Sequence, residues 1–472
     1  KNVIDPRFTV KLKDYGQTEK TVDATPRSSD GQLLFLMEMI SKMKSTDGNK
    51  GRGSRIASVH NGSSLFTGDA GGGESNIRRY IIENDLLEAI IQLPNNLFYN
   101  TGITTYIWVL SNNKSANKKG KVQLIEASLL FRKLRKNLGN KNCELAPEHI
   151  SEIIKTYIDC LEKDRKAEER GIASKVFDNR DFGYYKVNIE RPDRRKAIFT
   201  SDRIETLRFD KTLKEPMEWV YSKWGNEVYN SDILKRHEKE IIKWCEENDI
   251  SLNAQNKSRL LKIDTWKKQA SIIETAVLLM NKFGSTEFTN FNEFKNQIDE
   301  ILKEQKIKLS AGERSQILNA VSLYDENADK VIKSKSQFTD DQLTKLLDKL
   351  GCNKEELADF GYYVTGVENE FITYETSSDL RDSENIPIKE NIHQYFTREV
   401  KPHVSEAWID TDSIKIGYEI SFNKYFYRHK PLRTIEEVGA EIIALEQESE
   451  GLIAEILGID ASSDYKVSGG VK

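Results

Sequence analysis

Apolar residues recur every third or fourth position in several stretches of the chain, a period that predicts amphipathic α-helices. The first stretch, GQLLFLMEMISKMK at 31–44, has one broad apolar face, and Ser29 or Asp30 precedes it as a candidate N-cap. Residues 77–87 predict a second helix, directly after a glycine-rich loop. A third helix is predicted over 148–164, where the apolar residues of one side are Ile150, Ile153, Ile154, Tyr157, Ile158 and Leu161.

Short runs rich in β-branched and aromatic residues alternate with these helices and predict buried strands. One run extends from Ile56 to Val59, and the others lie at 88–94, 103–112 and 121–128. Helices that alternate with buried strands are typical of an α/β sheet. Because the strands are few, we expect half of such a sheet rather than a complete one.

The remaining segments have different patterns. Residues 1–30 are polar and contain a TPRSSD stretch, which predicts a loop, and residues 177–195 predict an extended strand pair. From about 200 to 355 the chain is rich in Lys, Glu and Asn and almost free of proline, which predicts an all-α region. Its predicted helices lie at 230–247, 256–283, 290–304 and 311–322.

The last periodic stretch, residues 434–458, carries apolar residues at steps that alternate between three and four. This is the heptad pattern of a helix that packs against another helix. A partner helix on another chain and packing onto the chain's own domain both explain the pattern. The seam consists of Ile435, Val438, Ile442, Leu445, Ser449, Leu452 and Ile456.

Composition narrows the class of protein. The 472 residues are enough for two or three domains, and the formal net charge of -4 gives no bulk attraction to nucleic acid. The four cysteines are far apart and the six histidines show no metal-binding spacing, so neither a disulfide scaffold nor a zinc site is expected. No apolar run reaches the length of a membrane span, and we expect a cytoplasmic protein.

The clearest candidate for chemistry is the loop in LPNNLFYNTGITTYIWVL, residues 93–110. Aromatic rings beside amide groups can form a slot for a planar polar ligand, such as a base flipped out of DNA. The alternative interpretation is a β-hairpin loop whose aromatic side chains cap the edge of the sheet. The candidate base-contacting residues are Phe98, Tyr99, Asn100 and Thr101.

Two basic stretches are candidates for contact with the DNA backbone. RKLRKNLGNK (132–141) could instead be a solvated loop, and YFYRHKPLR (425–433) an aromatic strand followed by a basic turn. The glycine-rich loop at 67–76 precedes a helix and matches no phosphate-binding motif, so a connector or lid is favoured over an anion site. The basic residues concerned are Arg132, Lys133, Arg135, Lys136, Arg428, Lys430 and Arg433.

Taken together, these stretches resemble the modification (M) subunits of type I restriction–modification systems, which are adenine-N6 DNA methyltransferases. The resemblance is most specific over residues 54–114 and weakest over the helical region at 200–355. The stretches that carry it are RSSDGQLLFLMEMISKMK, GSRIASVHNGSSLFTGDAGGGESNIRRYIIENDLLEAIIQLPNNLFYNTGITTYIWVLSNNK, KVQLIEAS, DFGYYKVNIERP, LRDSENIPI, REVKPHVSEAWID and KIGYEISFNKYFY.

The resemblance implies a Rossmann-like methyltransferase sheet followed by a mainly helical C-terminal region. It implies S-adenosylmethionine as cofactor, and Asp30, at the start of the helix after the family's catalytic turn, as a residue near it. It further implies DNA, a specificity (S) subunit, a restriction (R) subunit and a second M subunit as partners. The helix at 434–458 would then contact the S subunit.

The chain departs from the family in one respect. The family places an Asn-Pro-Pro-Phe/Tyr turn at the reacting amino group, and none of the nine prolines here adjoins another. We therefore expect no catalytic residue in this chain, a cofactor site mostly outside it, and a first residue just after the catalytic turn. The chain alone would be inactive.

Three hypotheses follow. The chain is part of a methylation subunit, or a truncated scaffold that binds DNA or the S subunit without catalysis, or a half whose missing part another polypeptide supplies. The expected organisation is a second half of the methyltransferase domain (1–165), an extended connector (166–199), a helical domain (200–355), a mixed aromatic-rich segment (356–433), the heptad helix (434–458) and a flexible tail (459–472).

Overall fold

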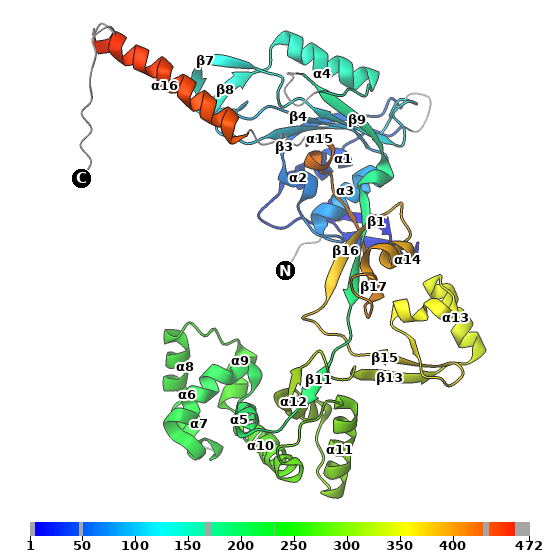
Figure 1. Cartoon of the computed structure of the whole chain (residues 1–472), viewed down its shortest axis with the longest axis vertical. Helices are drawn as coiled ribbons and strands as arrows, with labels where there is room; N and C mark the ends of the chain where they lie inside the picture. The colour runs from blue at the N-terminus through cyan, green and yellow to red at the C-terminus, as the bar shows by residue number, and fades with distance from the viewer. Residues whose placement is uncertain (1–4, 47–50, 166–170, 231, 428–433, 458–472) are drawn as a thin grey trace.

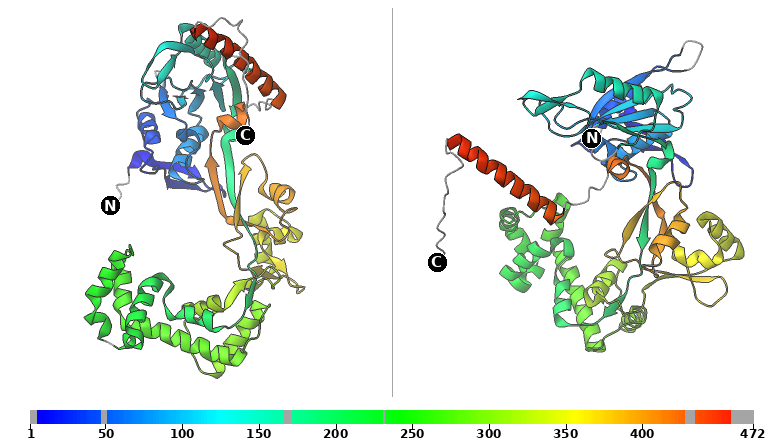
Figure 2. Two further views of the ribbon diagram at one scale, coloured as in Figure 1. Left: turned by 60° about the vertical axis from the view of Figure 1, so that its left-hand side comes forward. Right: turned by 45° about the horizontal axis from the view of Figure 1, so that its top comes forward.

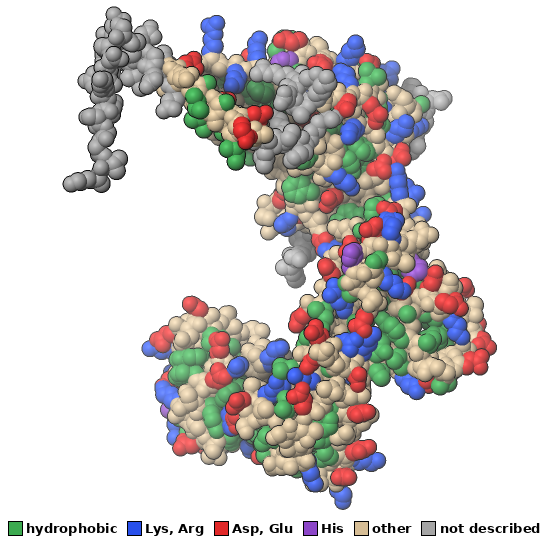
Figure 3. All heavy atoms as spheres, in the orientation of Figure 1, with side chains coloured by type: hydrophobic (Ala, Val, Ile, Leu, Met, Phe, Trp, Pro, Cys, Tyr) green, Lys and Arg blue, Asp and Glu red, His purple; other side chains and the backbone are tan. Residues whose placement is uncertain are grey.

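The computed structural model describes residues 5–46, 51–165, 171–230, 232–427 and 434–457. The molecule has the shape of an open C, with a sheet-containing lobe at the top of Figure 1 and a helical lobe at the bottom. Figure 3 shows the open space between the two lobes in the space-filling view. Long strands join the lobes along one side, as both views in Figure 2 show.

The upper lobe contains a five-stranded sheet in the order β3-β5-β4-β6-β9. The pair β4–β6 is parallel, and the other pairs are antiparallel. All four predicted strands are present, which confirms the α/β class. The strands are β3 (Arg55–Asn61), β4 (Leu87–Gln92), β5 (Thr105–Ser111), β6 (Lys121–Glu126) and β9 (Ala173–Asp178).

Alternate residues of these strands serve two cores, because successive side chains in a strand point to opposite faces. Ile90 and Trp108 join the core on the side of α1 (Gln32–Ser41), α2 (Ser63–Phe66) and α3 (Gly73–Glu83). Ile91 and Val109 join the core beneath α4 (Pro147–Asp159). Burial on both faces explains why the consecutive residues Ala89, Ile90 and Ile91 of β4 are all apolar.

The edge strand β3 pairs only with β5 among the described strands. Three large apolar side chains near this edge are exposed: Phe35 by 73%, Val59 by 52% and Phe66 by 58%. A strand edge with unpaired backbone groups and apolar neighbours is a surface that proteins usually cover. This is the arrangement expected of half a sheet.

Helix α4 lies where the third helix was predicted, and its apolar side is only partly buried. Ile153 is buried, whereas Ile150, Ile154 and Ile158 are 44%, 48% and 60% exposed. The helix contacts the sheet along a narrow line, so only residues close to Ile153 and Thr156 lie against it.

The N-terminal segment is also more ordered than expected. Instead of a loop, residues 1–30 contain a hairpin of β1 (Thr9–Lys13) and β2 (Glu19–Asp23), paired in antiparallel register. Val10 and Leu12 alternate with lysines and are buried in the core next to α3. Two apolar residues form too short a pattern to predict a strand, because prolines and polar residues surround them and favour a loop.

The expected strand pair at 177–195 is wrong in its pairing. β9 belongs to the upper sheet, whereas β10 (Gly183–Glu190) lies in a second sheet of order β16-β10-β17. Its partners β16 (Asp382–Pro387) and β17 (Trp408–Tyr418) come some 200 residues later in the chain. Local sequence patterns carry no information about such distant pairing.

The helical lobe contains the helices predicted from the Lys-, Glu- and Asn-rich sequence, together with further short ones. Two apolar cores hold it, one around Phe294 and the other around Trp266. Its helices are α5 (Ser201–Glu205), α6 (Lys214–Trp224), α7 (Ile233–Arg236), α8 (Glu238–Glu247), α9 (Ala254–Leu261), α10 (Ile263–Phe283), α11 (Phe291–Glu304) and α12 (Ala311–Val321).

Short elements connect this lobe to the rest. They are β11 (Arg195–Ala197), β12 (Ser322–Tyr324), β13 (Ile332–Gln337), α13 (Asp340–Leu350), β14 (Tyr363–Val364), β15 (Glu370–Tyr374) and α14 (Ile392–Tyr395). Helix α15 (Phe422–Phe426) lies in the upper lobe, where Phe422 joins the core that contains Trp108. The last helix, α16 (Ile435–Leu457), projects away from the body of the molecule in Figures 1 and 2. Among the described residues, none of the helices combines the length and apolar character needed to cross a bilayer.

Candidate nucleic-acid interface

The loop between β4 and β5 is closed at its base by its own residues. The Asn96 N–H donates to the carbonyl oxygen of Gly102 at 3.3 Å, and the Thr104 hydroxyl donates to the side-chain oxygen of Asn95. A Cβ on Gly102 would lie 2.7 Å from Asn96 Oδ1, so the side chain of Asn96 lies close against Gly102. The base of the loop is therefore fixed, and residues 97–101 form its tip.

The predicted base-contacting residues all lie at this tip. Tyr99 is 59% exposed and Phe98 is 38% exposed, so both rings are partly open to solvent. Asn100 is exposed beside them, and Thr101 closes the tip through an isolated bridge with Phe98. The tip thus presents aromatic faces and an amide to solvent, the groups that stack on a base and read its edge.

The basic stretch after β6 is a hairpin and not the solvated loop considered above. It is formed by β7 (Arg132–Leu138) and β8 (Lys141–Glu144). The backbone N–H groups of Asn140 and Asn142 donate to the carbonyl oxygens of Tyr99 and Asn96, at 2.9 and 3.1 Å. The structure therefore brings together two candidate stretches that lie more than thirty residues apart.

A thiol and an ammonium group add to this contact. The Cys143 thiol donates to the Asn95 carbonyl oxygen at 3.1 Å, and burial raises the pKa of this thiol, which keeps it protonated as a donor. Lys141 Nζ lies 5.5 Å from the centroid of the Tyr99 ring, a cation–π distance. Loop and hairpin thus form one continuous surface, here called the loop–hairpin surface (residues 95–103 and 132–144).

The basic side chains of the hairpin differ in whether they form an ion pair. Arg132 is paired with Glu144 at 2.6 Å. Lys133, Arg135 and Lys136 are exposed, and none of them forms an ion pair with the part of the chain that the structure describes. Three unpaired cations beside exposed aromatic rings match the combination that nucleic-acid surfaces use.

Asp30 lies apart from that surface, at the start of α1. Gly31 is the N-cap residue and carries no side-chain bond, so neither Ser29 nor Asp30 is the N-cap that the sequence suggested. The Asp30 carboxylate accepts from Ser63 Oγ at 2.6 Å and from Gln32 Nε2 at 2.9 Å. Burial disfavours its charge, but these bonds outweigh burial and lower the pKa of Asp30.

His60, on β3, was not singled out from the sequence. It is 5% exposed, lies beside Trp108, and neither ring nitrogen has a hydrogen-bond partner among the described residues. Burial lowers the pKa of His60 to about 4, although the nearby Asp30 charge acts in the opposite direction. The imidazole is therefore neutral at pH 7.

His60 should make the stability of the protein depend on pH. In the unfolded chain the imidazole takes up a proton below about pH 6.5, whereas in the folded chain it does so only near pH 4. Its contribution is thus complete above pH 6.5 and is lost as the pH falls, by about 3 kcal/mol at pH 4. Denaturant unfolding of wild type and His60→Leu between pH 7 and 4 should show this difference.

His403→Leu is the matched control for this measurement, because it removes an imidazole at an exposed position. Parallel pH profiles for wild type and His60→Leu would show that His60 is protonated equally well in the folded and unfolded states.

The glycine-rich loop before α3 is held by packing. A Cβ on Gly73 would lie 2.0 Å from the Thr25 carbonyl oxygen. Glu74 follows in the first turn, is 6% exposed, and accepts a hydrogen bond from the Arg27 side chain at 3.1 Å. Since a carboxylate already occupies the helix N-terminus, the loop is a packed connector in this structure.

The other predicted positions are only partly described. Arg428, Lys430 and Arg433 lie outside the described residues, as do the side chains of Leu452 and Ile456 and the tail at 459–472. On the described part of α16, Ile435 is 88% exposed, Ile442 58% and Leu445 59%, whereas Val438 is half-buried. Most of the described seam is open to solvent.

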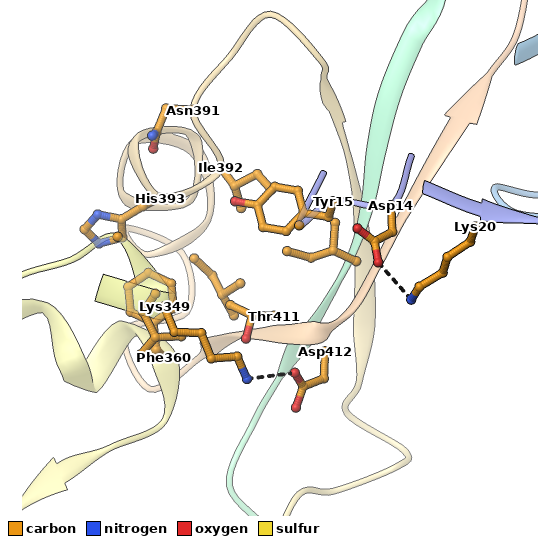
Figure 4. Close-up of a pocket in the computed structure, with 15 residues that line it drawn as sticks. Asp14, Tyr15, Lys20, Lys349, Phe360, Asn391, Ile392, His393, Thr411 and Asp412 are labelled. Atoms are coloured by element: carbon orange, nitrogen blue, oxygen red, sulfur yellow. Dashed lines mark hydrogen bonds and ion pairs between the residues drawn. The ribbon is translucent and has the colours of Figure 1, made fainter. Parts of the chain in front are cut away.

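A separate cavity of about 440 Å³ lies between the β1–β2 hairpin and β17 (Figure 4). Its charged side chains are paired with each other, Lys20 with Asp14 at 2.8 Å and Lys349 with Asp412 at 3.4 Å. None of the residues predicted as functional lines this cavity. Among the described residues, no group of His, Cys, Asp or Glu side chains is arranged to hold a metal ion.

The part of the chain that contains the loop–hairpin surface is similar to known proteins. Residues 3–193 match the family model described as N-6 DNA Methylase. A stretch of 103 residues is 39% identical to the type I restriction enzyme MjaVII methylase subunit of Methanocaldococcus jannaschii. Over this part of its sequence, the chain is similar to the methylase subunits of type I restriction enzymes. The resemblance noted from the sequence is confirmed for this part of the chain.

Other relatives of this kind show a similar extent of likeness. The MpnII methylase subunit of Mycoplasma pneumoniae is 37% identical over 105 residues. Both matches cover 22% of this chain and 17% of the relative, so the shared stretch is a small part of each relative's length.

Two solved structures also match in part. The methyltransferase subunit of a type I restriction–modification system from Streptococcus thermophilus is 23% identical, with a TM-score of 0.26, over 33% of this chain and 28% of that one. The M protein of the type I restriction enzyme EcoKI is 18% identical, with a TM-score of 0.22, over 32% and 34%.

Proposed function

We propose that the chain is part of the methylation subunit of a type I restriction–modification system. When complete and assembled with a specificity subunit, this subunit transfers a methyl group from S-adenosylmethionine to adenine N6 in DNA. The observation that carries the proposal is the loop–hairpin surface, because it combines exposed aromatic rings with unpaired cations inside the segment that matches N-6 DNA methylases.

In this proposal the hairpin and the loop perform different tasks. Lys133, Arg135 and Lys136 contact phosphates and fix the position of the duplex, without reading its sequence. Tyr99 and Phe98 stack on an adenine that has left the duplex, and the amide of Asn100 bonds to its edge. The loop would form one wall of the pocket that holds the target base.

The residues present do not form an S-adenosylmethionine site by themselves. The sequence contains no Asn-Pro-Pro-Phe/Tyr turn. Asp30 is the acidic group expected near the cofactor, and its two oxygens already accept hydrogen bonds from Ser63 and Gln32. We therefore assign Asp30 a place beside the cofactor site and assign no step of methyl transfer to this chain's residues.

The partners are proposed on two grounds. The exposed seam of α16 suits a helix of the specificity subunit, because a row of apolar side chains in water favours a helical partner. The restriction subunit and a second methylation subunit are proposed as partners only because the chain resembles type I methylation subunits. The open edge of β3 would be covered by further methyltransferase sheet, from the same polypeptide or from another.

A second candidate function is a scaffold that binds DNA or the specificity subunit without catalysis. The absence of the catalytic turn from the sequence favours it for the chain as it stands.

Titration calorimetry tests what this chain contributes to the cofactor site. When S-adenosylmethionine is titrated into the purified 472-residue chain, we expect no heat of binding. Clear one-to-one binding would contradict the account, because the site would then be built from residues interpreted here as loop and helix. In that case Asp30→Asn would test the acidic residue proposed to lie beside the cofactor.

A further inference from the structure

The turn of the β7–β8 hairpin lies directly against the tip of the loop. Gly139 has a φ of +61°, and a Cβ at this position would lie 2.6 Å from the carbonyl oxygen of Tyr99. That distance is shorter than real Cβ contacts, and the atom it meets is backbone, which cannot rotate away. Both the backbone conformation and the close approach therefore require glycine at position 139.

The same turn provides the hydrogen bond that holds the tip. The Asn140 N–H donates to that Tyr99 carbonyl oxygen at 2.9 Å, one residue after the glycine. The Tyr99 side chain is mostly exposed, and Lys141 of the hairpin lies over its ring. Both of these contacts to Tyr99, through its backbone and its ring, come from the β7–β8 hairpin.

The free cations are on the same hairpin. Lys133, Arg135 and Lys136 lie on β7, the strand that leads into the turn at Gly139. β7 and β8 pair at both ends of β7, where Lys133 lies opposite Cys143 and Leu138 lies opposite Lys141, with a register shift between these two pairs. The strand that carries the cations is thus tied to the turn at Gly139. A phosphate that fixes the strand therefore also fixes the turn, and through it the backbone of Tyr99.

We propose that Gly139 is a positioning residue that couples phosphate binding on the hairpin to base contact by Tyr99. The inference rests on the proposed function, since it assigns a mechanism to the same loop–hairpin surface. Gly139 touches neither phosphate nor base, and it acts by letting the turn approach the loop. Enlarging it should displace Tyr99 while leaving the cations where they are.

The experiment measures the binding of two DNA probes to the full chain by fluorescence anisotropy. One probe is a fully paired duplex, and the other is the same duplex with a single extrahelical adenine. Wild type should prefer the second probe by about 10-fold, which is in the range of base stacking on an aromatic residue. In Gly139→Ala this preference should fall to about 1, while affinity for the paired duplex and its salt dependence stay within twofold.

Two further variants separate displacement from backbone strain. Gly120 also has a positive φ, of +70°, but a Cβ there meets no atom within 4 Å, so Gly120→Ala should keep the preference. Gly139→Asn adds a Cβ at a position where asparagine tolerates the backbone conformation, and it should lose the preference as alanine does. Thermal melting within a few degrees of wild type shows that each variant is folded.

The possible results distinguish the two proposals. If wild type prefers the extrahelical adenine and both Gly139 variants retain that preference, the positioning role of Gly139 is overturned and the proposed function stands. If Gly139→Ala and Gly120→Ala lose the preference equally, strain alone explains the loss and the coupling is also overturned. If wild type binds both probes equally or neither, the proposed function of this surface is itself contradicted.

Discussion

Replacing Lys133, Arg135 and Lys136 together by alanine should weaken the binding of duplex DNA by roughly 100-fold at about 0.1 M salt. These are exposed cations without an ion-pair partner in the described structure, so removing them breaks no internal bond. Each phosphate contact that is lost reduces the number of counterions released on binding. The slope of log Kd against log salt should therefore fall by about 2.7.

The measurement is anisotropy of a labelled duplex with the full chain at several salt concentrations. A matched control is the triple replacement of the exposed Lys303, Lys306 and Lys308 in the helical lobe, which removes the same charge at a distance from the surface. This control should change affinity by less than threefold. Equal losses in the two triple variants would mean that net charge, and not the hairpin, governs binding.

The second large effect concerns α16. Replacing Ile442 and Leu445 by aspartate should weaken binding to the specificity subunit by about 100-fold, equivalent to roughly 3 kcal/mol. Both side chains lie on the seam and are more than half exposed in the isolated chain. A carboxylate buried between two helices loses its hydration without gaining a partner, whereas in the free chain it stays in water.

This prediction has a control on the same helix. Ala444 is exposed and lies off the seam, so Ala444→Asp adds a charge to α16 without placing it between the two helices. We expect its affinity for the specificity subunit to remain within threefold of wild type, as measured by calorimetry of the purified pair. Unchanged affinity in the seam variant would show that α16 packs elsewhere.

Much of the upper lobe could be predicted because its signals are local. The runs that became β4 and β5 are buried on both faces, and continuous apolar character is sufficient to identify such strands. Helix α3 was expected at 77–87 and is found four residues earlier, because Gly73 begins it against the Thr25 carbonyl oxygen. That contact comes from tertiary structure and leaves no pattern in the sequence.

Two features could not be predicted, for a shared physical reason. The strand β10 pairs with β16 and β17, which are distant in sequence, and how much of the apolar side of α4 is buried depends on where the helix lies on the sheet. Neither fact depends on the local period of the residues. The β1–β2 hairpin was not predicted for a related reason. Only two of its residues, Val10 and Leu12, are buried in the core, and two residues do not make a recognisable strand pattern.

In the candidate site, too, the residue types could be predicted from the sequence, whereas the contacts between distant segments could not. The tip residues were predicted from their types, and their contact with a base stays a prediction; in the structure Tyr99 is 59% and Phe98 38% exposed. The contact between Tyr99 and Asn140 was not predicted, although the Gly-Asn pair at 139–140 was a turn signal that indicates a hairpin. Which surface a hairpin contacts is decided by the folded sheet beneath it.

Hydrogen–deuterium exchange of the full chain, with and without a DNA duplex, tests whether the loop–hairpin surface binds DNA. The account predicts slower exchange on DNA binding in residues 95–103 and 132–144, with little change in the helical lobe. Protection that appears in the helical lobe and leaves both of these segments unchanged would contradict the assignment of the loop–hairpin surface to DNA.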